Sequence, residues 1–101
     1  LRKKEKTFGK WAGVRLNGVD NRMLYVPEGF AHGFLSLSDK TELLYKCSSY
    51  FKKEAERTLH WSDSAIRISW PSEIPISNMI ISEKDQEGLS LDRLLELDEL
   101  F

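Results

Sequence analysis

The sequence contains few of the residues that build metal centres and cross-linked folds. Among its 101 residues there is one cysteine, Cys47, and there are two histidines, His32 and His60, with no His-x-His pair. A lone cysteine excludes an internal disulfide, so a reducing compartment, the cytoplasm, is the expected location. Transition-metal sites draw on several His or Cys ligands. We therefore expect no metal ion.

Long apolar runs and an excess of charge of one sign are also absent. No stretch has the length and composition of a signal segment or a membrane span. The 15 Lys and Arg residues nearly balance the 16 Asp and Glu residues, for a formal net charge of −1. The basic run at residues 2–6 is interrupted by Glu5 and is typical of a solvated segment. We expect neither nucleic acid nor a membrane as a partner.

Two further kinds of catalytic machinery are missing from the sequence. Gly29 and Gly33 flank a strand candidate and do not open a helix, so they form no phosphate-binding loop. Cys47 lies within a strand candidate with no base beside it, which favours a small core residue over a nucleophile. Acid–base chemistry and binding remain as candidate functions.

Short apolar and aromatic runs, interrupted by turn residues, dominate what is present. Hydrophobic residues make up 41% and charged residues 31%, a balance typical of one globular domain, here residues 1–101. Turns are predicted at Asn17–Gly18, Pro27–Gly29 and Ser38–Lys40. The strand candidates between and beyond these turns include residues 10–16, 22–26, 41–51, 58–61 and 66–70.

One helix is predicted at the C-terminal end, over residues 90–101. Ser90 is a good N-cap, Asp92 suits the first turn, and the leucines that follow have helical spacing. Residues 52–57 are predicted to form a loop or a single helical turn. Short antiparallel strands with one terminal helix indicate an all-β sandwich or barrel.

Strand periodicity predicts which side chains share a face near the middle of the chain. Leu43, Tyr45 and Cys47 point the same way in the strand candidate at 41–51. His32 and Phe34 share a face of the preceding strand. If the two strands form a hairpin, the imidazole and the phenol look into one cavity.

Several motifs resemble a known family. The spacing Pro27-x-Gly29-x-x-His32 is similar to the second signature motif of cupin barrels. The longer runs at residues 25–34 and 44–47 resemble, more narrowly, the dTDP-4-dehydrorhamnose 3,5-epimerase family. Further matches in the family's order lie at residues 7–14, 56–57, 61–63, 70–71 and 81–85.

The resemblance implies a cupin-type jelly roll, here a partial one made of short antiparallel strands with a C-terminal helix. It covers only the C-terminal part of a family member, which is nearly twice as long. The chain also starts at Leu1 rather than Met, within a charged run. We therefore expect a fragment, a processed product or a trimmed form of a longer protein. A jelly roll needs about eight strands, so open edges favour a homodimer, as in the family.

The resemblance also implies acid–base chemistry on a dTDP-linked 4-keto-6-deoxy sugar of dTDP-rhamnose biosynthesis, without a cofactor. Tyr45 matches the family's proton-donating tyrosine, and Asp85 matches the aspartate that orients the catalytic histidine. That histidine lies upstream of every residue here, and His60 is in a context typical of a structural histidine. The alternatives are a core aromatic at Tyr45 and a solvated loop carboxylate at Asp85.

The resemblance assigns four further residues to substrate binding. His32 lines the family's sugar-nucleotide pocket, and Glu56 matches a glutamate near the nucleotide. Phe51 belongs to a matched aromatic pair but replaces the more usual tyrosine, and Lys46 follows Tyr45 in the same matched run.

We expect this chain alone to be inactive or badly impaired as an enzyme, because the family's general base is missing. Loss of a positioned base typically costs a factor of about 10² to 10⁴ in rate. Alternatives are a non-catalytic sugar-nucleotide-binding module and a dimerising cupin fragment. A related sugar 3,4-ketoisomerase is an enzyme alternative, but the context of Tyr45 fits the epimerases better.

Overall fold

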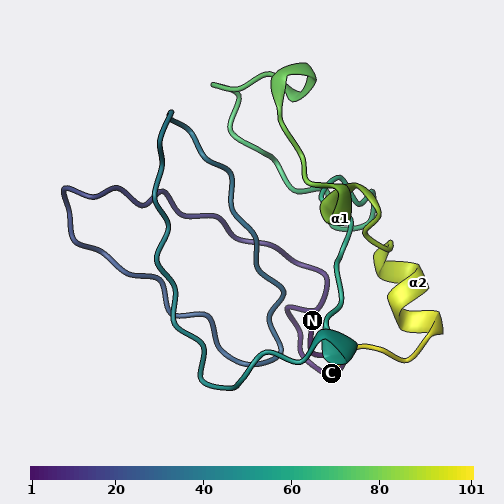
Figure 1. Cartoon of the computed structure of the whole chain (residues 1–101). Coiled ribbons are helices and arrows are strands. Elements are labelled where there is room, and N and C mark those ends of the chain that lie inside the picture. Colours follow the sequence, from purple (N-terminus) through teal and green to yellow (C-terminus); the bar gives the residue numbers. More distant parts are fainter.

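The computed structural model describes residues 1–101, and its regular elements are few and short (Figure 1). Two 3-10 turns, η1 (Lys53–Ala55) and η2 (Ile76–Asn78), precede two helices, α1 (Glu83–Gln86) and α2 (Leu91–Glu96). The β-structure amounts to one isolated parallel bridge between Leu59 and Leu89. None of the helices is both long and apolar enough to cross a membrane.

The first half of the chain forms long irregular segments that run out and back on one side of the molecule (Figure 1). The whole chain has 21 backbone–backbone hydrogen bonds, whereas a folded domain of this length has about 70. Its radius of gyration is 14.6 Å, larger than the roughly 13 Å of a compact domain. The strands of the jelly roll stay a prediction, because the segments expected to form them carry no ladder of hydrogen bonds.

The turn predicted at Asn17–Gly18 is present, but a side chain holds it. The Asn17 Oδ1 atom accepts hydrogen bonds from the N–H groups of Val19 and Asp20, both at 2.9 Å. The left-handed residue is Asn21, with a φ of 52°, and not Gly18. The turn is therefore an Asx-type turn rather than the two-residue hairpin turn that the sequence favours.

The predicted C-terminal helix is confirmed over its first turns as α2. The Ser90 hydroxyl accepts a hydrogen bond from the Arg93 N–H at 3.2 Å, which caps the helix as expected. The helix ends at Glu96, short of the predicted end at residue 101. Asp98 adopts a left-handed φ of 52°, and it and Glu99 donate backwards to carbonyls of the last turn. This is a Schellman arrangement, which stops a helix.

The core lies in the second half of the chain. The three buried apolar residues are Ile66, Leu91 and Leu94, which are 8%, 6% and 1% exposed. Two of them lie on α2, so this short helix is held by packing more than by its own length. The only strongly buried charged side chain in the structure, Asp63, lies beside them and is 7% exposed.

The Asp63 carboxylate joins the turn at residues 61–66 to the start of α2. Its Oδ1 atom accepts from the N–H groups of Ala65 and Ile66, and its Oδ2 atom accepts from the Leu91 N–H, all at 2.9 Å. Burial raises the pKa of this carboxyl, but the three backbone donors and the nearby His60 more than offset that, so the pKa lies below its ordinary value.

A close backbone contact fixes the segment before α2. The His60 N–H donates to the Leu89 carbonyl and the Leu89 N–H to the Thr58 carbonyl, both at 2.8 Å. A β-carbon on Gly88 would lie 2.8 Å from the His60 backbone nitrogen and Cα atoms. Only glycine allows the two segments to approach this closely.

The two ends of the chain lie together beside η1 (Figure 1). The Lys3 N–H donates to the Phe101 carbonyl at 2.7 Å, and the Lys3 ammonium pairs with Asp98. Nearby, the Arg57 guanidinium pairs with Glu99 at 2.8 Å. The ends are thus tied to each other and to the segment that follows η1.

Asp63→Ala should lower the free energy of unfolding by about 2 kcal/mol, because three buried N–H groups lose a charged acceptor. Urea unfolding followed by tryptophan fluorescence measures this, since Trp61 lies next to Asp63 and the Trp70 indole donates to the Trp61 carbonyl at 3.0 Å. Asp39→Ala, at an exposed turn, is the matched control. Equal effects of the two substitutions would contradict the role given to Asp63.

Stability should also fall in acid through Asp63. Its pKa is lowered in the folded state, so its contribution is complete above the ordinary carboxyl pKa of about 3.9 and is lost as pH falls through the folded-state pKa. The midpoint of thermal unfolding, measured from about pH 7 to about pH 2, should therefore drop less steeply in Asp63→Asn than in the unchanged chain. Parallel profiles would show that other carboxyls control the acid transition.

Candidate functional site

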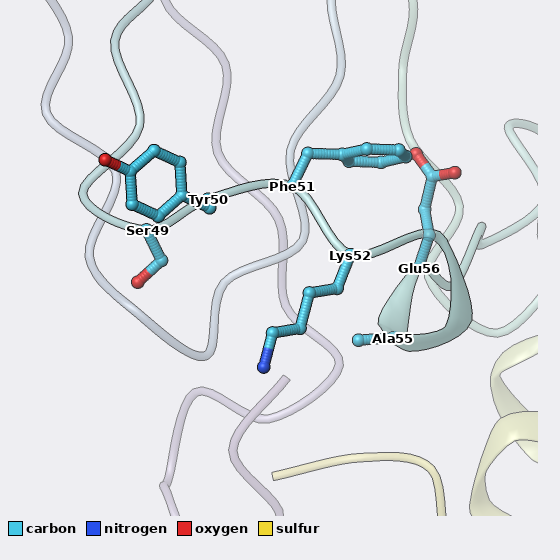
Figure 2. Close-up of a pocket in the computed structure, with 6 residues that line it drawn as sticks. All are labelled: Ser49, Tyr50, Phe51, Lys52, Ala55 and Glu56. Carbon is cyan, nitrogen blue, oxygen red and sulfur yellow. The ribbon is translucent and has the colours of Figure 1, made fainter.

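A hollow of about 440 Å³ opens where the segment after residue 48 enters η1. Figure 2 shows the Phe51 ring and the Glu56 carboxylate on one side of this segment, and the Lys52 ammonium on the other. The residues that line it are Ser49, Tyr50, Phe51, Lys52, Ala55 and Glu56. It thus combines an aromatic surface with one carboxylate and one ammonium group.

Two of the residues assigned to substrate binding, Phe51 and Glu56, therefore line one hollow. Local structure explains this, because η1 turns the chain between them and brings the Glu56 carboxylate back beside the Phe51 ring (Figure 2). The Glu56 N–H closes the turn by donating to the Lys53 carbonyl at 3.2 Å. The hollow is shallow and open, since Tyr50 and Phe51 are 98% and 75% exposed.

Helix α1 lies next to this hollow through an ion pair. The Lys84 ammonium pairs with the Glu56 carboxylate, across 28 positions of sequence. The next residue, Asp85, accepts a hydrogen bond from the Ser82 hydroxyl at 2.7 Å, and its N–H donates back to the Ser82 oxygen at 3.2 Å. Asp85 thus helps to cap α1, a local role that the sequence analysis did not foresee.

Lys84 is the residue of this site that sequence reasoning missed. It stands in the matched block at residues 81–85, directly before Asp85, and this position was the available signal. Its pairing with Glu56 depends on a contact distant in sequence, which no local pattern reports. The ion pair brings the predicted Asp85 segment and the predicted Glu56 segment together.

The remaining predicted residues lie elsewhere. Tyr45 is 74% exposed, His32 and Lys46 are also exposed, and none of the three lines the hollow at η1. The structure lends no support to an enclosed cavity shared by His32 and Tyr45. The physical reason is that the strands expected to carry them are unpaired, so no sheet face forms. Their catalytic and binding roles stay predictions.

A second hollow, of about 390 Å³, lies at the turn of residues 61–66 and the segment that follows it. It is lined by Trp61, Ser62, Asp63, Ser64, Arg67, Ile68, Trp70 and Ile76. The polar groups at its base already have partners, because Asp63 binds three N–H groups and the Trp70 indole binds the Trp61 carbonyl. His60, beside it, accepts at Nδ1 from the Ser62 N–H at 3.2 Å, as a turn-forming histidine does.

Known proteins resemble this chain along most of its length. A family model described as dTDP-4-dehydrorhamnose 3,5-epimerase matches residues 1–93. The chain is similar to curated proteins of that name from Shigella flexneri, with 47% identity over 87% of the chain and 46% of that protein. Those from Salmonella typhimurium and Methanothermobacter thermautotrophicus are 44% and 46% identical, over 94% and 85% of the chain and 50% and 46% of the proteins.

The chain spans about half the length of the curated relatives it matches. No solved structure gives a significant match. The matched part includes both segments that the Lys84–Glu56 ion pair joins, since each lies within residues 1–93.

The Lys84–Glu56 ion pair should show a small coupling energy. Both side chains are partly exposed, so a double-mutant cycle with Lys84→Met and Glu56→Gln should give about 0.2–1 kcal/mol. The coupling should weaken in about 1 M salt, because salt screens exposed charges. Urea unfolding at low and high salt measures it. Lys52→Met is the matched control, and an equal coupling of Glu56 to Lys52 would contradict the docking of α1.

Proposed function

The chain belongs to the dTDP-4-dehydrorhamnose 3,5-epimerase family, and from this premise we propose that it carries the nucleotide-facing part of such an epimerase's site. Its ligand is then a dTDP-linked 4-keto-6-deoxy sugar of dTDP-rhamnose biosynthesis. The observation that supports this most is the juxtaposition of Phe51 and Glu56 in one hollow, with the Asp85 segment held beside it by Lys84.

The proposed chemistry is proton exchange at the two carbons that flank the sugar ketone. The ketone acidifies these hydrogens, and an enolate forms when a base removes one. In the proposal, Tyr45 acts as the general acid and returns the proton from the opposite face. Asp85 orients the histidine base, which in the family belongs to a part not represented among these residues. The substrate ketone stabilises the carbanion, so no cofactor is required.

Binding in the proposal rests on an aromatic surface and a few polar groups. The exposed ring of Phe51 offers a flat face for the thymine base. Glu56 offers a carboxylate at the edge of the same hollow, and Lys84 balances its charge. His32 and Lys46 complete the sugar and phosphate contacts when the strands that carry them are paired.

The proposal places these residues in one domain, a cupin-type jelly roll that is completed by pairing, with a second copy in a cytoplasmic homodimer as the partner. Exposed apolar side chains support it. Leu44, Tyr45 and Phe34 are 89%, 74% and 66% exposed, and soluble proteins seldom leave such a concentration of apolar surface uncovered. Neither nucleic acid nor a membrane has a part in this proposal.

A second candidate function is sugar-nucleotide binding without turnover. The observation that favours it is the exposure of Tyr45, which in this chain faces solvent rather than a reacting carbon. Binding needs the hollow at η1 and its neighbouring polar contacts, whereas epimerisation also needs a base, an acid and exclusion of water.

Calorimetry with dTDP and deuterium exchange into the ketosugar distinguish the two candidates. We expect saturable dTDP binding that Phe51→Ala weakens by about tenfold, because a stacked aromatic contact is lost. Phe101→Ala, an exposed phenylalanine outside the hollow, is the matched control. Exchange in this chain should be lower than in a full-length family member by a factor of about 10² to 10⁴. Absence of dTDP binding would contradict both candidates.

A further inference from the structure

Arg2 holds the turn at Pro27–Phe30, and its contact with Glu28 spans 26 positions of sequence. Its guanidinium donates twice to the Glu28 carbonyl, from Nε at 3.1 Å and from Nη2 at 2.6 Å. The same guanidinium lies over the Phe30 ring, with Cζ 5.4 Å from the ring centroid. One cation thus binds a main-chain carbonyl through two N–H groups and also lies over an aromatic ring.

Gly29 makes room for this contact. It is the one buried residue in the first half of the chain, and its φ of 84° is a conformation that side chains disfavour. A β-carbon there would lie 2.8 Å from both Cγ and Nε of Arg2. The amino group of Leu1 also donates to the Gly29 carbonyl. The turn and the arginine therefore fit each other closely.

His32 follows this turn by two residues, and its direction depends on how the turn is held. Phe30 and His32 are two positions apart, so in an extended segment they lie on the same face. A guanidinium that fixes the Phe30 ring and the Glu28 carbonyl therefore also restricts the direction in which the imidazole leaves the chain.

We propose that Arg2 is a positioning residue for sugar-nucleotide binding, which acts by holding the Pro27–Phe30 turn and so orienting His32. This rests on the proposed function, since it takes His32 as a contact of the dTDP-linked sugar. It goes beyond that function by giving a role to the basic run at residues 2–6, which composition alone presents as solvated.

The contact requires arginine rather than any cation. Two donors on one rigid plane serve the Glu28 carbonyl while the Cζ atom of the same group lies over the Phe30 ring. A lysine ammonium is a point charge and cannot make both contacts in this geometry. Arg2→Lys is therefore a conservative variant that keeps the charge and removes the two coplanar N–H donors.

The test measures the His32 ring directly. In unchanged chain and in Arg2→Ala, Arg2→Lys and Lys4→Ala, the Cε1–H resonance of His32 is followed by NMR, with His60→Gln to assign it. Arg2→Ala should move this resonance toward the random-coil value and weaken dTDP binding by about tenfold. Arg2→Lys should resemble Arg2→Ala both in the His32 resonance and in the weakened dTDP binding. Lys4→Ala, an exposed charge in the same run, should change neither.

Folding is checked separately through the methyl resonances of Leu94. This residue lies in α2, is 1% exposed and is far from Arg2 in sequence. Unchanged Leu94 signals in Arg2→Ala show that the variant is folded. Gly29→Ala, whose β-carbon would displace Arg2, should shift the His32 resonance in the same way.

An unmoved His32 resonance in Arg2→Ala, or equal weakening of dTDP binding by Arg2→Ala and Lys4→Ala, overturns the proposal. The second result would assign the effect to net charge. If the unchanged chain does not bind dTDP, the proposed function fails. The His32 resonance then decides alone whether Arg2 orients this side chain.

Discussion

The packed part of this molecule depends on one carboxylate. Asp63 accepts three backbone N–H groups, two from its own turn and one from the first residue of α2. The helix has six residues, and a helix that short does not persist in water by itself. It persists here because its N-terminal N–H is bound to Asp63, Ser90 caps it, and its Leu91 and Leu94 side chains are buried.

The two halves of the chain differ in how their backbone groups are satisfied. After residue 57, turns, caps and the Leu59–Leu89 bridge close on one another within the chain. Before residue 57, the segments predicted to form strands leave many of their apolar side chains exposed. A strand is stable only beside another strand, and the chain spans about half of each curated relative. The first half therefore forms no paired strands in this structure, and the sheet expected there stays a prediction.

Sequence reasoning succeeded where the signal is local. The cap at Ser90 and the turn after Asn17 each follow from side chains within four residues of the backbone they organise. The helical turn allowed for residues 52–57 also forms, without a side-chain cap. The pairing of strands is not local, because it depends on which segments meet. The same holds for the site: the aromatic pair and Glu56 lie close in sequence and line one hollow, whereas the Lys84 contact and the Arg2 contact span more than twenty residues.

The Lys3–Phe101 hydrogen bond makes this chain suitable for circular permutation. Because Lys3 is hydrogen-bonded to Phe101, a short peptide linker could join the two ends without pulling on either of them. New ends could then be opened at an exposed turn such as the one after Asn17. A circularly permuted chain of this kind would keep the core around Asp63 intact. It would change the order in which the irregular segments follow one another in the sequence.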